Sequence, residues 1–475
     1  RDADRSARQA SKLCELGARG IHGIEHGDGV TGEGSTSFGE PHAAARTHNE
    51  REPESRLGAS EVLTEGGLAV AENAGGFTDG AVLGNCAHDA QREEVWRGIH
   101  LSSITKRDLL YPNHALVACI GEHEHRDMTS PALASAIDSF ANTRGYLSAA
   151  TMGLPTCAAV TEMTEKLGQW ATATCNPMNY GDIVERTRGH YARLVGIDAT
   201  RVAIGSQTSV MASLIACSLP AGSEVLVVES DFTSIVYPFL QHPGLEVRAV
   251  PLAELAAAIS DTTALVAFSL IQSCNGKVAD SAAITAAAKR HGARTLCDIT
   301  QAAGVHPVDA TQFDATVCHA YKWLCSPRGV AFLTISEDFA EHITPVQAGW
   351  YAGDDVWGSV YGTDMKLAAD ARRFDVSPAW QAWVGAEHPI AMFADLDIAE
   401  VWEHCTGLAN LLCDELGIER QNQAIVTWPD ESGADLAKLA AAGITASGRA
   451  GRLRAAFHLW NTEEDVAAVI AALRV

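Results

Sequence analysis

Lys322 stands between Tyr321 and Trp323, directly after an apolar run at 315–319 that is predicted to be a buried strand. A lysine in apolar surroundings loses affinity for its proton and becomes nucleophilic, as the lysine of a Schiff base must be. Asp298 lies at the end of a second short apolar run upstream. Pyridoxal phosphate needs a lysine for its aldehyde and a carboxylate that keeps its ring nitrogen protonated. Together the two residues predict a pyridoxal phosphate site with Lys322 and Asp298 as catalytic groups.

A phosphate site is predicted at 201–217, where a short strand leads into an apolar helix. Ser206, Gln207 and Thr208 occupy the turn between the two elements. Free backbone N–H groups and the positive end of the helix dipole favour an anion at such a turn, and the hydroxyl groups add donors. The alternative is that serine and threonine only cap the helix, as they commonly do.

Three stretches carry a family resemblance: DITQAAG at 298–304, YKWL at 321–324 and PRG at 327–329. They resemble the class V family of pyridoxal phosphate enzymes, which includes cysteine desulfurases, kynureninases and proteins like isopenicillin N epimerase. The resemblance implies that Lys322 forms the aldimine with the cofactor. It also implies that Asp298 pairs with the ring nitrogen.

The resemblance implies further cofactor contacts and puts the phosphate at the turn described above. Gln301 would lie near the ring oxygen, and Phe232, which follows a buried strand at 224–229, would stack on the ring. Tyr321 and His319 would contact the phosphate. The alternatives are that Phe232 is a plain core residue and that His319 is a packed core histidine.

The segment at 452–465 resembles the last strand of the family and the helix start after it. The resemblance implies that Arg454 holds the substrate α-carboxylate, which the planar donors of arginine match. The alternative is a surface charge on an edge strand. Desulfurases of this family carry a persulfide-forming cysteine shortly before this arginine, whereas the stretch at 445–452 has none. Chemistry through an enzyme persulfide is therefore not expected.

Two loops after the sheet, at 349–357 and 372–380, are rich in tryptophan and arginine. The resemblance implies that such loops reach the active site of a neighbouring subunit, and hence a homodimer with shared sites. Trp350 and Arg373 are the predicted substrate-binding residues there, although the sequence does not decide between Arg372 and Arg373. An interface would also explain why one loop carries so many tryptophans.

Strands and helices alternate between 201 and 335, which predicts a mostly parallel, doubly wound sheet with its ligand at the carboxyl ends of the strands. The resemblance implies fold type I of the pyridoxal phosphate-dependent transferases, an α/β fold with a seven-stranded type of sheet. We predict a large cofactor-binding domain at 151–388 and a small α+β domain at 389–475. The segment at 128–150 is predicted to join the small domain.

The composition is typical of a soluble globular enzyme, with 47% hydrophobic and 20% charged residues. A formal net charge of −24 argues against nucleic acid or an anionic membrane surface as a partner. No apolar run is long enough to cross a bilayer. The 12 cysteines show neither CxxC pairs nor zinc spacing, which predicts buried thiols, no metal site, and a reducing, cytoplasmic location.

Residues 1–127 contain no methionine and half of the 18 histidines. The first 60 residues show no helical or strand periodicity. We expect this stretch to lie outside the functional fold, either as an over-extended translation or as a disordered extension. The glycines at 27–32 satisfy GxGxxG but lack the strand and helix that a nucleotide site requires. His123 and His125 lack a third metal ligand.

The predicted activity is chemistry at the Cα of an amino acid, with transamination as the first choice because most of the family performs it. A β-eliminating C–S or C–C lyase and an amino-acid epimerase are the alternatives. A binding or regulatory protein on the same fold is a further alternative, against which the intact Lys322 and Asp298 argue. An oxidoreductase that uses a nicotinamide lacks any fingerprint in a strand–turn–helix context.

Overall fold

The computed structural model describes residues 130–474. The predictions for 1–127, including the glycines at 27–32 and the pair His123 and His125, lie outside the described residues. Within the described part of the chain, no helix is both long and apolar enough to span a membrane.

Seven strands form the central sheet. They are β1 (Val202–Gly205), β2 (Glu224–Val228), β3 (Glu246–Val250), β4 (Thr263–Ser269), β5 (Arg294–Asp298), β6 (Ala315–His319) and β7 (Ala331–Ile335). Their order across the sheet is β1-β7-β6-β5-β4-β2-β3. The neighbouring pairs from β3 to β6 are parallel, whereas β7 is antiparallel to both β1 and β6. The predicted mostly parallel sheet of seven strands is thereby confirmed.

Helices connect and flank these strands. They are α2 (Pro131–Ile137), α3 (Cys157–Ala171), α4 (Asn179–Leu194), α5 (Thr208–Ala216), α6 (Thr233–Leu240), α7 (Leu255–Ala258), α8 (Ser281–His291), α9 (Glu337–Ala340) and α10 (Trp380–Ala394). Short 3-10 turns are η1 (Ala199–Arg201), η2 (Leu252–Glu254), η3 (Ala310–Gln312), η4 (Trp350–Ala352) and η5 (Ala371–Phe374). Side-chain caps fix several starts; Asp280, for example, accepts the backbone N–H of Ala283 at the start of α8.

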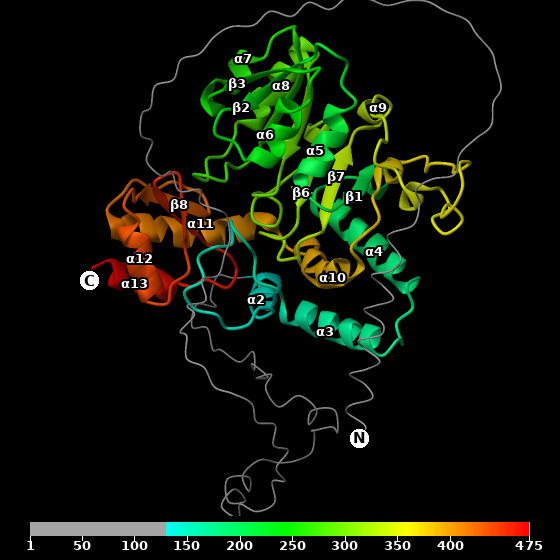
Figure 1. Ribbon diagram of the computed structural model, residues 1–475. Coiled ribbons are helices and arrows are strands. Elements are labelled where there is room, and N and C mark those ends of the chain that lie inside the picture. Colours follow the sequence, from blue (N-terminus) through cyan, green and yellow to red (C-terminus); the bar gives the residue numbers. More distant parts are fainter. Residues whose placement is uncertain (1–129, 475) are drawn as a thin grey trace, which may run out of the picture. The chain divides into compact units, whose positions relative to one another are not determined.

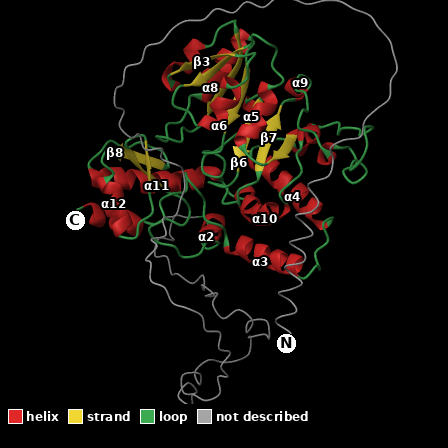
Figure 2. Ribbon diagram, viewed as in Figure 1, coloured by secondary structure: helices red, strands yellow, loops and turns green. Residues whose placement is uncertain are grey.

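Helices cover both faces of the sheet (Figures 1 and 2). Successive strand residues point to opposite faces. Ala203 therefore packs in the core that contains α5 and α6, while its neighbours Val202 and Ile204 pack in the core that contains α4, α8 and α10. Because both faces are buried, the inner strands of the sheet are largely apolar rather than alternating, whereas the edge strand β3 carries Glu246 and Arg248 and is not buried.

A second, smaller sheet lies near the carboxyl end of the chain. Its antiparallel strands are β8 (Ile425–Pro429), β10 (Arg452–Ala456) and β9 (Ser447–Arg449), in that order. Its core includes side chains of α11 (Ile398–Leu416), α12 (Ala434–Ala441) and α13 (Glu463–Leu473). The amino-terminal segment reaches this sheet through parallel bridges from Tyr146 to Thr445 and from Ser148 to Ala456.

The predicted division into a large and a small domain stays a prediction. Its boundary after residue 388 falls inside α10, which packs on α3 and α4. The core of the small sheet takes its first helix from α11. We therefore propose a boundary at 395–397, between the two helices.

The strand ends that precede the predicted site residues lie at one edge of the central sheet. Gly205 of β1 pairs with Ala331 of β7, and Ala331 pairs with His319 of β6. Asp298 of β5 pairs with Ser269 of β4. The sheet therefore gathers the segments after β1, β4, β5 and β6 at the edge where ligands bind in such folds.

Candidate active site

Lys322 lies in the turn after β6 and is only 4% exposed. Its Nζ is 5.0 Å from the ring centroid of Phe232 and 5.5 Å from that of Tyr321. Burial lowers the pKa of Lys322 to about 8, and the charge of Asp298 opposes this shift. An amine in this range is partly neutral near pH 8, which suits a nucleophile or a base.

Asp298 is the last residue of β5 and is 3% exposed. Its Oδ1 accepts the backbone N–H of Thr300 at 2.8 Å. Burial raises the pKa of Asp298 to about 6, while Thr300 and the charge of Lys322 lower it. The carboxylate therefore lies close enough to the lysine for each charge to stabilise the other.

Backbone packing fixes the turn that carries the lysine. The N–H of Gly153 donates to the carbonyl of Tyr321 at 2.9 Å, and a Cβ at position 153 would lie 2.0 Å from the carbonyl oxygen of Lys322. Gly304 has φ +92°, and a Cβ there would lie 2.8 Å from the carbonyl oxygen of Trp323. Only glycine fits such approaches without displacing the turn.

Gln301 is buried and bridges two segments. Its Nε2 donates to the carbonyl of Ala150 at 3.0 Å, and its Oε1 accepts the indole N–H of Trp323 at 2.7 Å. This amide ties the strand of Asp298 to the lysine turn. Sequence reasoning did not find this role, and the predicted contact of Gln301 with a ring oxygen stays a prediction.

The start of α5 adjoins this group. Thr208 Oγ1 lies 3.4 Å from Thr300 Oγ1, which also accepts the backbone N–H of His319 at 3.0 Å. Gln207 occupies the N-cap position, and no side chain caps the helix there. The alternative in which Ser206 or Thr208 only caps α5 therefore does not describe this turn, and its N–H groups remain available to an anion.

His319 is 7% exposed, and its ring centroid is 4.3 Å from that of Tyr321. Its Nε2 is buried and has no hydrogen-bond partner among the described residues. Burial lowers the pKa of His319 to about 3, with the charges of Arg328 and Lys322 adding to the shift. The ring is therefore neutral, and its buried nitrogen without a protein partner is suited to bind a ligand.

Phe232 follows β2 and is 41% exposed. The alternative of a plain core phenylalanine therefore does not describe it. Sequence reasoning missed the preceding Asp231, whose carboxylate accepts the backbone N–H groups of Phe232 and Ser269, both at 2.7 Å. It also accepts the Nε2 of Gln272 at 3.1 Å. An aspartate in the turn just after a buried strand was the signal that could have identified it.

Arg454 is 1% exposed and lies on β10, the central strand of the small sheet. It is therefore not a surface charge on an edge strand. Its Nε donates to Ser447 Oγ at 3.0 Å, and its Nη2 donates to Thr151 Oγ1 at 2.7 Å. No carboxylate pairs with it within residues 130–474, and burial lowers its pKa to about 10. A buried guanidinium surrounded by neutral acceptors is suited to binding an anionic ligand.

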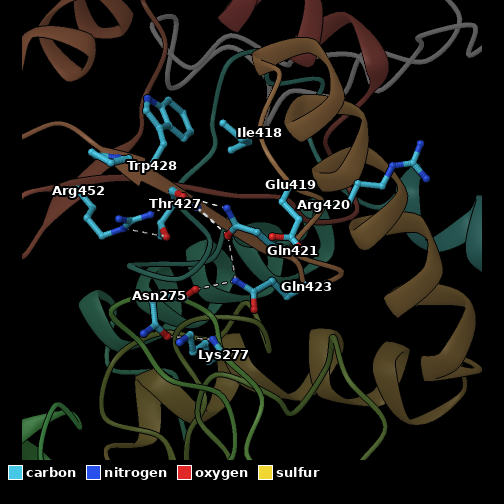
Figure 3. Close-up of a pocket in the computed structure, with 11 residues that line it drawn as sticks. Asn275, Lys277, Ile418, Glu419, Arg420, Gln421, Gln423, Thr427, Trp428 and Arg452 are labelled. Atoms are coloured by element: carbon cyan, nitrogen blue, oxygen red, sulfur yellow. Dashed lines mark hydrogen bonds between the residues drawn. The ribbon is translucent and has the colours of Figure 1, made fainter.

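The loop after β4 links this arginine to the large domain. Its Ser273 carbonyl accepts Arg454 Nη1. Its Asn275 carbonyl accepts Gln423 Nε2 at 2.6 Å, a contact that Figure 3 shows. The pocket of about 590 Å³ in Figure 3 lies between this loop and the small sheet. Its lining contains none of Lys322, Asp298 and Arg454. We therefore assign this pocket to the contact between the loop and the small sheet, and not to the reaction centre.

Trp350 and Arg373 lie on the loops after the sheet. Trp350 is half-buried, and its ring centroid is 5.2 Å from that of Trp357. Arg373 donates to the carbonyls of Asp370 and Ala369, and Arg372 donates to carbonyls of the other loop. The hydrogen bonds of Arg373 thus hold its own loop together, and those of Arg372 join the two loops. Their predicted role at a neighbouring subunit stays a prediction.

Comparison with known sequences identifies the family. The sequence model described as "Aminotransferase class-V" matches residues 147–446, well over half of the chain. The chain belongs to this family. As predicted from the sequence, it is therefore a class V enzyme with pyridoxal phosphate as its cofactor.

Its curated relatives in this family perform several reactions. The uncharacterized aminotransferase YcbU of Bacillus subtilis is 25% identical over 61% of this chain and 83% of its own length. Isopenicillin N epimerase of Streptomyces clavuligerus is 28% identical over 44% of this chain and 58% of that enzyme. Kynureninase of Deinococcus radiodurans is 28% identical over 48% and 57%, respectively. The chain thus spans under two thirds of the last two relatives.

Solved structures show the same fold. The cystine C–S lyase C-DES, in complex with its reaction product cysteine persulfide, has a TM-score of 0.63 at 20% identity, over 70% of this chain and 97% of the lyase. The cysteine desulfurase CsdA of Escherichia coli has a TM-score of 0.61 at 21% identity, over 72% and 95%. The predicted fold is thereby confirmed.

The described residues fit pyridoxal phosphate. A buried lysine lies beside a buried carboxylate, as the aldehyde and the ring nitrogen of the cofactor require. The uncapped start of α5 and the unpartnered nitrogen of His319 provide donors for a phosphate. Each of these groups can form a further hydrogen bond or ion pair with a ligand, which a purely structural role would not explain.

Proposed function

We propose that this class V enzyme acts at the Cα of an amino-acid substrate and that its reaction is transamination. The observation that carries the proposal is the buried pair of Lys322 and Asp298, together with a buried Arg454 that has no carboxylate partner among residues 130–474. These are the groups needed to hold a cofactor aldehyde, its ring nitrogen and a substrate carboxylate.

In this proposal, each end of the cofactor has its own set of residues. Asp298 holds the ring nitrogen in its protonated form, Phe232 covers the ring, and Gln301 lies beside the ring oxygen. The phosphate is held by Ser206, Gln207, Thr208, His319 and Tyr321. When bound, pyridoxal phosphate supplies an electron sink for charge that develops at the substrate Cα.

Lys322 has a second role as general base. Its Nζ takes the proton from the substrate Cα. For transamination, Nζ would then return that proton to the carbon that carried the aldehyde of the cofactor. A pKa of about 8 lets the amine both accept and release a proton near neutral pH. The apolar and aromatic surroundings of the amine exclude water from this transfer.

Arg454 anchors the substrate α-carboxylate through its planar donors. Thr151 and the Ser273 carbonyl hold the guanidinium in one orientation, so the bound amino acid presents its Cα at a fixed position. In a homodimer with shared sites, Trp350 and Arg373 of one subunit would complete the substrate pocket of the other.

Spectra and products of the purified enzyme test this proposal. We expect a yellow protein in which borohydride fixes the cofactor covalently to Lys322, and a Lys322→Ala variant in which no covalent product forms. A panel of amino acids, each tested with a 2-oxo acid, would yield a new amino acid from the 2-oxo acid. If no amino acid of the panel passes its amino group to an acceptor, transamination is excluded.

A β-eliminating lyase is the second candidate, and a thiol near the substrate anchor favours it. Cys274 lies on the loop that holds Arg454, and its pKa is raised, chiefly by burial and also by Asp231. A protonated thiol there could donate a proton to a group that leaves from Cβ. Release of pyruvate together with sulfide or another β-substituent, without any amino acceptor, would identify this reaction, and racemised substrate would identify an epimerase.

A further inference from the structure

The inference concerns Arg328, which follows the lysine turn and has no role in the function proposed above. It lies three residues before Ala331, the first residue of β7. Ala331 pairs with Gly205 on one side and with His319 on the other. Arg328 therefore emerges at the sheet edge between the segment that leads into α5 and the end of β6.

The guanidinium of Arg328 lies over the ring of Tyr321, with its Cζ 4.4 Å from the ring centroid. The same ring lies 4.3 Å from the ring of His319 and 5.5 Å from Lys322 Nζ. One aromatic ring thus connects the arginine, the histidine with an unpartnered nitrogen, and the lysine.

The charge of Arg328 is not balanced by a carboxylate. No ion pair involves it within the described residues, its side chain is exposed, and the hydroxyl group with which it forms a hydrogen bond, that of Tyr321, carries no charge. It also lowers the pKa values of His319 and Lys322, so its positive charge acts on this site. Its position is fixed by the turn at Pro327 and by Gly329, which has φ +99°.

We propose that Arg328 is a further cofactor-binding residue and that its guanidinium binds the phosphate of pyridoxal phosphate. This inference rests on the proposed function. A planar guanidinium is the side chain best matched to phosphate oxygens. Opposite it, the uncapped start of α5 and Thr208 supply neutral donors. Arg328 supplies a full positive charge beside Tyr321 and His319, the proposed partners of a phosphate that carries about two negative charges.

The test compares two ligands that differ only in the phosphate. The full-length enzyme, freed of its cofactor, is titrated with pyridoxal phosphate and with pyridoxal, and binding is followed by the absorbance of the cofactor. For Arg328→Gln we expect affinity for pyridoxal phosphate to fall by about 10- to 100-fold, the range for a hydrogen bond to a charged group. Affinity for pyridoxal is expected to stay within about twofold, since it has no charge for the arginine to bind.

Two further variants serve as controls. Arg328→Lys keeps the charge but not the planar fork, so an intermediate loss for pyridoxal phosphate is expected. Arg449→Gln removes another exposed arginine whose charge lowers the pKa of Lys322, but this residue lies on β9 of the small sheet. In Arg449→Gln, the ratio of the affinity for pyridoxal phosphate to that for pyridoxal is expected to match the ratio in the unaltered enzyme.

Three outcomes would overturn the inference. If Arg328→Gln loses equal affinity for pyridoxal phosphate and for pyridoxal, Arg328 acts on the lysine through Tyr321. If it loses affinity for neither ligand, Arg328 does not touch the cofactor. A raised KM for substrates with an acidic side chain, at normal cofactor affinity, would assign Arg328 to the substrate instead. If the unaltered enzyme itself takes up neither ligand, the proposed function fails, which is a separate result.

Discussion

At the scale of single residues, the candidate site consists of charges that are buried and only partly balanced. Burial lowers the pKa of Lys322 and raises that of Asp298, so each group is held near the point where it can exchange a proton. Arg454 is buried among neutral acceptors. Such an arrangement costs folding free energy and is stabilised when ligands with the complementary charges bind.

The first prediction concerns the carboxylate. We expect Asp298→Asn to reduce kcat by about 100-fold or more, the range found for positioned acid–base groups. Because Asp298 raises the pKa of Lys322 against the effect of burial, its removal lowers that pKa below about 8. The acidic limb of the pH profile would move to lower pH accordingly. An unchanged limb would show that the two charges are not coupled.

The second prediction concerns the substrate anchor. Arg454→Gln is expected to raise KM for amino-acid substrates by about 10- to 100-fold, because a charged hydrogen bond to the carboxylate is lost. Steady-state kinetics measures this change, and titration with pyridoxal phosphate checks that cofactor affinity is kept. Amino amides, which lack the carboxylate, are expected to be equally poor substrates of both enzymes. If Arg454→Gln were a much poorer enzyme than the unaltered one with amino amides as substrates, the assignment of Arg454 to the carboxylate would be contradicted.

At the scale of elements, loops from distant parts of the chain hold the lysine turn. The segment around Gly153 lies against the carbonyl of Lys322, and His458 Nε2 lies 2.9 Å from the carbonyl of Trp323. Burial lowers the pKa of His458 to about 4, so the ring is neutral. Since Leu459 N–H donates to its Nδ1, the proton is on Nε2, and this N–H donates a hydrogen bond to the carbonyl oxygen of Trp323. The small domain thereby helps to orient the turn in the large domain.

The third prediction follows from this packing. Gly153→Ala would place a Cβ 2.0 Å from the Lys322 carbonyl oxygen, so the turn must shift. We expect a loss of about 1–3 kcal/mol in the free energy of unfolding, typical of overpacking, and weaker cofactor binding. Denaturant unfolding and cofactor titration measure the two effects. Gly168→Ala in α3, where nothing lies within 4 Å, is the control and is expected to stabilise the protein slightly.

The fourth prediction concerns a buried ion pair beside β1. Asp375 is fully buried, accepts the N–H of Ile204 at 2.7 Å and pairs with Arg188 at 2.7 Å. Asp375→Asn removes the buried partner of Arg188 and leaves the guanidinium only the half-exposed carboxylate of Glu185, which is expected to cost about 3 kcal/mol in chemical denaturation. The exposed pair of Arg193 and Asp395 is the comparison, and Asp395→Asn there is expected to cost less than about 1 kcal/mol.

At the scale of the whole molecule, two domains meet at the site. Lys322 and Asp298 come from the central sheet, whereas Arg454 comes from the small sheet and reaches Thr151 and Ser273. If Arg454 binds the substrate carboxylate as proposed, the position of the small sheet fixes the distance between that carboxylate and Lys322.

The fifth prediction concerns residues 1–127. The sheet, the cores described here and every candidate site residue lie within 130–474, and the family match begins at 147. We expect an enzyme that lacks residues 1–127 to keep its unfolding temperature, its cofactor affinity and its kcat. Loss of folding or of cofactor binding in the shortened enzyme would show that the amino-terminal stretch belongs to the functional fold.

The sequence by itself determined the fold class, the cofactor and the pairing of Lys322 with Asp298. Short apolar runs separated by helical stretches specify parallel strands buried on both faces, and the ends of such strands meet at one edge. A residue at the end of a run is therefore placed by local pattern alone. The predicted homodimer and cytoplasmic location remain predictions.

Only the tertiary structure decided which groups are left without partners. The contact of Arg454 with Thr151 joins residues 303 positions apart, and the bond from Gln301 to Ala150 joins residues 151 apart. Neither leaves a periodic signal in the chain. Whether a buried charge is balanced, and whether a glycine has room for a Cβ, depends on atoms brought together from distant segments, and these contacts determine the chemistry of the site.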